Sequence, residues 1–94
     1  MNELITEEIL QEFKDRMHLG DFEDDNLTSI LSASYKDLKH TCGNYTLEDK
    51  PFKELVIERS RYVYNDALEY FEKNFLTRIN NLAIRKALDE DESE

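Results

Sequence analysis

The chain has 94 residues, of which 22 are acidic and 12 are basic, so its formal net charge is −10. This charge disfavours non-specific attraction to nucleic-acid phosphates or to anionic membrane surfaces. The length allows one domain with a modest core and leaves little room for a deep catalytic cavity. Apolar residues make up 39% of the chain, and two Gly and one Pro offer few turns, so an all-α domain of long helices is expected.

The sequence contains neither a membrane-spanning run nor a pair of cysteines. No stretch of about 18 apolar residues occurs. The N-terminus has no basic segment followed by an apolar one, so neither a membrane protein nor an exported one is expected. Cys42 is the only cysteine, which rules out an intrachain disulfide and favours a reducing compartment. Five Tyr and five Phe residues supply core material that a disordered chain lacks.

The first helix is predicted from Thr6 to about Met17. Thr6 is a good N-cap, and the two glutamates that follow it suit the positive end of the helix dipole. Apolar residues then recur at helical spacing up to Met17. Gly20 is expected to end this helical unit.

An acidic segment, residues 21–26, precedes the second predicted helix. One of its aspartates is expected to cap that helix, and the others to stabilise its first turn. Ser34 marks a place where two helices can approach closely, Cys42 is expected to be a buried thiol, and Gly43 with Asn44 ends the helix. The apolar stripe of this helix runs at steps of three and four through Leu27, Ile30, Leu31, Ser34, Tyr35, Leu38 and Cys42.

The third helix is predicted from Pro51 to about Phe75, after a loop over residues 45–50. Proline is favoured in the first turn of a helix. The apolar surface is wider than one stripe, so this helix is expected to be central to the domain or to contact a partner. Most of its charged side chains are expected to form a solvated face. A second interpretation is that Arg59 and Arg61 contact a neighbouring subunit, because arginine suits ion pairs at interfaces.

The segment after Asn74 is apolar, but Asn80 and Asn81 interrupt its pattern. Two forms are left open for residues 82–88: a short fourth helix, or an extended arm that is ordered only in an assembly. The apolar content favours a docking arm. The last six residues include five acids and are predicted to form a disordered tail. We therefore expect one all-α domain, residues 1–88, with three main helices plus a short C-terminal helix or arm, followed by an acidic tail, residues 89–94.

No constellation of residues predicts a catalytic, cofactor or metal site. The acidic segment at 21–26 lacks the alternating ligands, central glycine and distal glutamate of a calcium loop. Two His and one Cys are fewer ligands than a structural zinc site requires. There is no glycine-rich phosphate loop and no Ser–His–Asp arrangement, and the many carboxylates are not diagnostic of acid–base chemistry. We expect that the protein is not an enzyme.

The order of features resembles a known protein family. A short helix leads into the acidic turn 21–27, and a second helix, beginning with residues 27–35, ends near Cys42 and Gly43. A long helix then carries residues 54–67, with the sequence ELVIERSRYVYNDA. This pattern is similar to the head–tail connector (head-completion, DNA-packaging adaptor) proteins of tailed bacteriophages and prophages of Gram-positive bacteria. The resemblance covers roughly residues 4–76.

The resemblance implies a structural role in the virion, at the head–tail junction, after assembly in the bacterial host cytoplasm. Such connectors form a ring, usually a dodecamer, beneath the portal protein. The ring extends the DNA channel, helps to retain the genome and offers a platform for the next head–tail component. DNA passes through without specific binding, and an isolated subunit can be a monomer if the ring contacts require the portal as a template. No cofactor and no membrane are implied.

The resemblance also implies candidate site residues. The candidate inter-subunit positions on the long helix are Arg59, Arg61, Tyr62 and Asn65. The candidate portal-docking arm spans residues 76–88 and includes Leu76, Ile79, Leu82, Ile84 and Arg85. The candidate channel-facing acids are Asp21, Glu23, Asp24 and Asp25. The chain departs from many relatives in its acidic tail and in having no proline in the arm.

A second functional class fits the same composition. A small acidic regulator that binds a single host protein, in the manner of a DNA mimic, would also need no active site. That class predicts a one-to-one complex and carboxylates that dominate the binding face. The charges on the longest predicted helix are mixed, which favours the connector.

Overall fold

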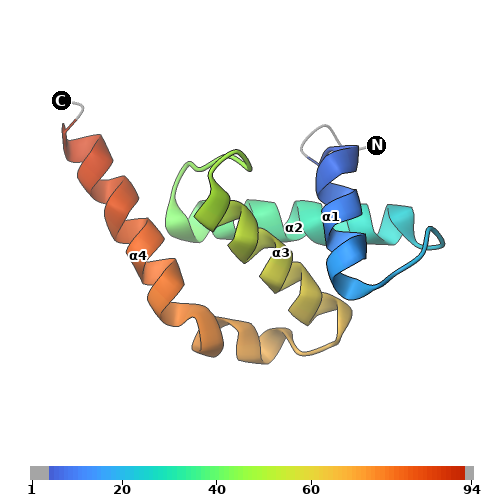
Figure 1. Cartoon of the computed structure of the whole chain (residues 1–94). Coiled ribbons are helices and arrows are strands. Elements are labelled where there is room, and N and C mark those ends of the chain that lie inside the picture. Colours follow the sequence, from blue (N-terminus) through green and yellow to red (C-terminus); the bar gives the residue numbers. More distant parts are fainter. Residues whose placement is uncertain (1–4, 93–94) are drawn as a thin grey trace.

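The computed structural model describes residues 5–92, with side chains for residues 5–89, and this part of the chain is helical and without strands (Figure 1). The all-α class is therefore confirmed. The elements, in chain order, are α1 (Glu7–Met17), α2 (Asp24–Cys42), α3 (Lys50–Tyr64), the 3₁₀-helix η1 (Leu68–Tyr70) and α4 (Phe71–Glu92).

Helix α2 is the centre of the arrangement. It makes its largest contact with α3, and it also packs against α4 and α1. In Figure 1, α1 and the connection from α1 to α2 lie at one end of the molecule, whereas α4 lies at the other end and its C-terminal half projects away from the body. The molecule is accordingly elongated, with extents of 47 × 28 × 17 Å.

Two small polar residues are buried in α2 and α3. Ser34 on α2 and Ser60 on α3 are both fully buried, and Arg59 on α3 donates a 3.0 Å hydrogen bond to Ser34. Ser60 donates its hydroxyl hydrogen bond to the carbonyl of Val56, 2.8 Å away in its own helix. The buried apolar residues around them are Leu27, Leu31, Tyr35, Leu38, Phe52, Leu55, Val56 and Ile57.

The ends of α1 and α2 follow the predictions only in part. Thr6 caps α1 as expected, because its side chain accepts a hydrogen bond from the backbone N–H of Ile9. The helix ends at Met17, as predicted, but its C-cap is His18, whose φ of 59° is left-handed, so the expected stop at Gly20 is wrong. The expected aspartate cap of α2 is also wrong, since the N-cap residue is Glu23 and its side chain makes no capping hydrogen bond.

The predicted continuous helix from Pro51 to Phe75 is wrong. Helix α3 ends at Tyr64, and Asp66 adopts a left-handed φ of 56°, which Asn and Asp tolerate better than other side chains. The turn brings the Tyr62 ring to 5.8 Å from the Phe71 ring, measured between centroids, and Phe71 stacks on Phe75 at 5.0 Å. Packing of these rings favours the turn over a straight helix, which would separate Tyr62 from Phe71.

Helix α4 is one continuous helix, so neither the interruption at Asn80 and Asn81 nor an extended arm is found. Asparagine lowers helix propensity by only a fraction of a kcal/mol per residue, roughly 0.7 at most. Burial of Ile79 and Leu82 in the core holds the middle of the helix. The acidic segment that we expected to be disordered from Asp89 is helical through Glu92, and residues 93–94 lie outside the described part.

Gly43 is the one glycine whose backbone requires the absence of a side chain. Its φ of 116° and ψ of −177° belong to a region that is essentially restricted to glycine. A Cβ at this position would lie 2.6 Å from Cγ of Lys86 on α4.

We expect Gly43→Ala to lower the free energy of unfolding by about 1–3 kcal/mol, measured by urea denaturation. Gly20→Ala is the matched control, because its Cβ meets only the exposed ring of Phe22, and an equal loss in both variants would contradict the prediction.

Candidate interaction surface

Tyr45 fixes the position of α4 against the rest of the chain. Its ring stacks on Phe52 with centroids 5.3 Å apart. Its hydroxyl donates a 2.7 Å hydrogen bond to the carbonyl of Leu82 and accepts a 3.0 Å hydrogen bond from Nε of Arg85. Arg85 also forms an ion pair with Asp49, the N-cap of α3. These contacts join the loop after α2, the start of α3 and the middle of α4.

The expected docking arm is divided by this packing. Ile79 and Leu82 are each only 5% exposed and belong to the core of this chain, so the expectation that they bury against another protein is wrong. Arg85 is occupied by Tyr45 and Asp49. Leu76 and Ile84 remain exposed.

Three large apolar side chains form the outer face of α4: Leu76, Ile84 and Leu88. They are 48%, 59% and 57% exposed, respectively. Ile84 and Leu88 are four residues apart and lie on one side of the helix, away from Ile79 and Leu82, whereas Leu76 precedes Ile79 by three residues and lies at the edge of the packed side. An apolar row on a projecting helix is typical of a contact with another protein.

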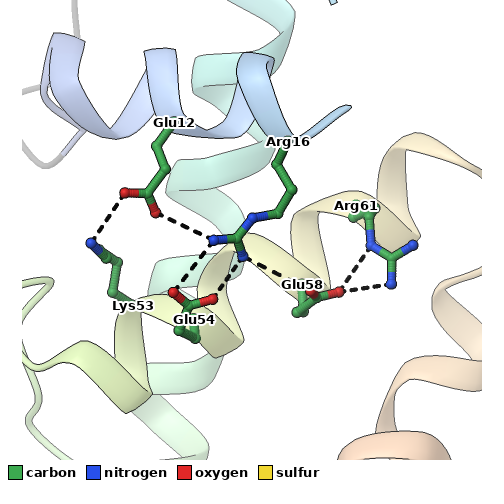
Figure 2. Close-up of polar contacts among 6 residues, drawn as sticks. All are labelled: Glu12, Arg16, Lys53, Glu54, Glu58 and Arg61. Carbon is green, nitrogen blue, oxygen red and sulfur yellow. Dashed lines mark hydrogen bonds and ion pairs between the residues drawn. The ribbon is translucent and has the colours of Figure 1, made fainter. Parts of the chain in front are cut away.

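The surface between α1 and α3 is covered by an alternating set of charges (Figure 2). Arg16 lies at its centre and donates hydrogen bonds to both carboxylate oxygens of Glu54, at 2.7 and 3.4 Å. These hydrogen bonds lower the pKa of Glu54 and raise that of Arg16. The outer members of the set are Glu12 with Lys53, at 3.2 Å, and Glu58 with Arg61, at 2.8 Å.

The four candidate inter-subunit residues are engaged within this chain. Arg59 donates to Ser34 at 3.0 Å and pairs with Asp37 on α2 at 3.2 Å. Arg61 pairs with Glu58 and lies over the ring of Tyr62. Tyr62 packs against Phe71 and Phe75, and the Asn65 side chain donates to the carbonyl of Arg61. A role for these residues between subunits stays a prediction.

The acidic segment is organised around Lys14, which the sequence did not single out. The Lys14 side chain is only 6% exposed, and its Nζ lies 2.6 Å from Oδ1 of Asp21 and 3.0 Å from Oδ1 of Asp24. These two hydrogen bonds raise the pKa of Lys14. Glu23 accepts a hydrogen bond from the hydroxyl of Tyr64 at 2.6 Å, which raises the pKa of that tyrosine. The candidate channel-facing acids are thus partly committed to holding the turn, and Asp25 is exposed.

Phe22 is the most exposed apolar side chain in the described part of the chain, at 98%. It follows Gly20 and Asp21 in the connection between α1 and α2, and its ring lies close to the Cα of Gly20. Phe22 was not among the residues singled out from the sequence. A large aromatic residue between acidic residues in a short polar connection indicates an exposed ring, and this pattern is visible in the sequence.

A small pocket of about 250 Å³ lies between α3 and α4. Pro51, Leu55 and Leu82 supply its apolar part, while Arg78, Asn81 and Arg85 supply its polar part. Arg78 lies over the ring of Phe75, 5.2 Å from its centroid, and forms no ion pair with another described residue. The sequence did not predict this pocket, because it forms only where α3 and α4 meet.

Tyr45→Phe is expected to lower the free energy of unfolding by about 1 kcal/mol, because it leaves the buried hydrogen bonds to Leu82 and Arg85 unmade. Amide hydrogen exchange should become faster in the middle of α4 than in α2. Tyr64→Phe removes a surface hydrogen bond to Glu23 and is the control. Unchanged exchange in α4 of the Tyr45 variant would show that the helix is held by other contacts.

The pKa of Glu54 is lowered in the folded chain, so its contribution to stability is present above the ordinary value of 4.5 and is lost as the pH falls through the folded pKa. We expect Glu54→Gln to cost about 0.5–1 kcal/mol at neutral pH. Below pH 4.5 the free energy of unfolding of the Glu54→Gln variant should depend less steeply on pH than that of the unsubstituted chain. Urea denaturation at several pH values measures this, with Glu72→Gln on the exposed side of α4 as control. Parallel pH profiles for the Glu54 variant and the unsubstituted chain would contradict the assignment.

The described part of the chain offers three features to other molecules: the outer face of α4, the Phe22 turn and the pocket between α3 and α4. Within residues 5–92, no three His, Cys, Asp or Glu side chains are grouped to hold a metal ion. None of the helices in that range has the length and apolar character needed to cross a membrane. Comparison with protein-family models, with curated proteins and with solved structures finds no match to this chain.

Proposed function

We propose that the chain is a structural head–tail connector of a tailed bacteriophage, which forms a ring under the portal, extends the DNA channel and joins head to tail. The observation that supports this most is the outer face of α4. Ile84 and Leu88 stand exposed on the C-terminal half of α4, which projects from the body (Figure 1), and Leu76 is exposed nearer the start of the helix. Apolar side chains in this position favour docking into a larger assembly.

The packing of the body supports an assembly role in a second way. Ion pairs and hydrogen bonds within the chain use Arg16, Arg59, Arg61 and Arg85. The core and the contacts between helices therefore do not depend on a partner, and α4 is held by Tyr45 and by burial of Ile79 and Leu82. A subunit of this kind can fold first and assemble afterwards.

The charge supports passage of DNA without binding. A net charge of −10 repels phosphates, and a channel wall of this sign lets DNA slide where a basic wall would hold it. Asp21, Glu23, Asp24 and Asp25 stay the candidate channel-facing acids. The other partner of the ring is the next head–tail component, for which the ring offers a platform.

The test is negative-stain microscopy of the purified chain, alone and mixed with the portal protein of the same phage. We expect rings, or an extra layer on the portal. Ile84→Glu should weaken the layer at least about tenfold, because it places a charge in the apolar contact. Ala33→Glu, at an exposed position of α2, makes the same change outside the outer face of α4 and is the control.

The opposite result identifies the rival class. A chain that stays monomeric and ignores the portal at high concentration would overturn the connector proposal. A one-to-one complex with a single host protein would then favour an acidic regulator. Equal effects of the Ile84 and Ala33 variants would reject the outer face of α4 as the docking surface.

A further inference from the structure

We propose that Phe22 of one copy of this chain inserts into the pocket between α3 and α4 of the next copy, so that subunits join head to tail. This inference deepens the proposed function, on which it rests, by naming the contact between neighbouring subunits of the ring. The partner is a second copy of the chain, and the recognised group is an aromatic ring flanked by carboxylates.

The Phe22 turn has the properties of an inserted group. The ring is 98% exposed although it is the largest apolar side chain of the segment. Its position is fixed from both sides, because Lys14 binds Asp21 and Asp24, and Tyr64 binds Glu23. An aromatic side chain that is held out into water by such contacts is typical of an interface anchor.

The pocket has the properties of the receiving site. Its volume of about 250 Å³ and its apolar part, formed by Pro51, Leu55 and Leu82, suit a single aromatic ring. Leu55 and Leu82 are buried core residues, so the floor is rigid. Leu55 and Leu82 are already shielded from water, so the ring would cover mainly the exposed Pro51, and this burial is favourable in free energy.

The charges around the two features are complementary. Acidic side chains flank Phe22, with Asp21 and Asp25 exposed. Two guanidinium groups, those of Arg78 and Arg85, lie at the pocket. Arg78 forms no ion pair with any residue of the described range 5–89, and its charge is therefore available to a carboxylate of the neighbouring copy. Arg85 is already paired with Asp49, so in a chain with net charge −10 the charge of Arg78 beside an apolar pocket is the local exception.

The positions of the two features in the fold determine the kind of assembly. The connection between α1 and α2 lies at the end of the molecule opposite α4, so Phe22 cannot fill the pocket of its own chain (Figure 1). A contact between two different surfaces of identical copies is heterologous and closes into a ring when the rotation between copies permits. Asn81 at the pocket lies three residues before Ile84 and seven before Leu88, so the pocket borders the outer face of α4 and the subunit contact adjoins the portal contact along this helix.

Complementation of two variants tests the inference. Phe22→Ala loses the inserted ring and keeps the pocket, whereas Arg78→Glu keeps the ring and reverses a charge at the pocket. Both positions are exposed, so both variants should fold like the unsubstituted chain. We expect each variant alone to self-associate at least about tenfold more weakly. Their mixture should form a one-to-one dimer by sedimentation velocity, because one intact contact remains.

Disulfide trapping tests the same contact when self-association is weak. Asp25→Cys and Asn81→Cys place a thiol beside the ring and beside the pocket. Native Cys42 does not interfere, because it is 2% exposed and burial raises the pKa of its thiol. We expect the mixed pair to form a disulfide-linked dimer under mild oxidation about tenfold faster than Asp25→Cys mixed with Ala33→Cys, since the contact raises the effective concentration of the two thiols.

The outcomes separate this inference from the proposed function. Equal trapping of the Asn81 and Ala33 pairs, with no complementation, overturns the Phe22 contact even if the chain forms a layer on the portal. Specific trapping without any portal layer supports the contact between copies and overturns the connector role. A portal layer that is lost with Phe22→Ala and with Arg78→Glu, together with a one-to-one dimer in the mixture of the two variants, supports both.

Discussion

The side chain of Tyr45 is the contact on which the arrangement of the helices depends. Its stacking on Phe52 ties the loop after α2 to α3, and its hydroxyl ties both to the backbone of α4 at Leu82. Arg85 and Lys86 lie over its ring, with Lys86 Nζ 4.4 Å from the ring centroid. Because α4 is held at this point, its C-terminal half can project from the body (Figure 1).

Local sequence signals predicted the elements well where a short-range cause acts. The all-α class, the Thr6 cap, the stripe on α2 and the stop at Gly43 follow from propensity and spacing within a few residues. The turn at Asp66 was missed because the hydrophobic period continues through it, and ring packing between Tyr62 and Phe71 favours the turn. Contacts between distant segments override a local pattern in this way.

The candidate site was predicted less well, for a physical reason. Exposure of Leu76 and Ile84 agrees with an interaction surface, but Ile79 and Leu82 have the same apolar character and are buried in this chain. Sequence alone does not show which face of a helix its own domain covers. Lys14 was missed for the same reason, because its aspartate partners lie in the following turn and their grouping appears only in three dimensions.

Pairing of Lys14 with Asp21 and Asp24 has a consequence for binding kinetics. A side chain on a loose loop loses conformational entropy when it is captured, and this loss weakens binding. The two ion pairs restrict the turn before any encounter, so Phe22 is presented in one preorganised geometry and that entropy loss is small. Exposed charges are screened by salt more than the buried Lys14 ammonium is. The turn should therefore keep its shape when salt screens the exposed charges of the chain.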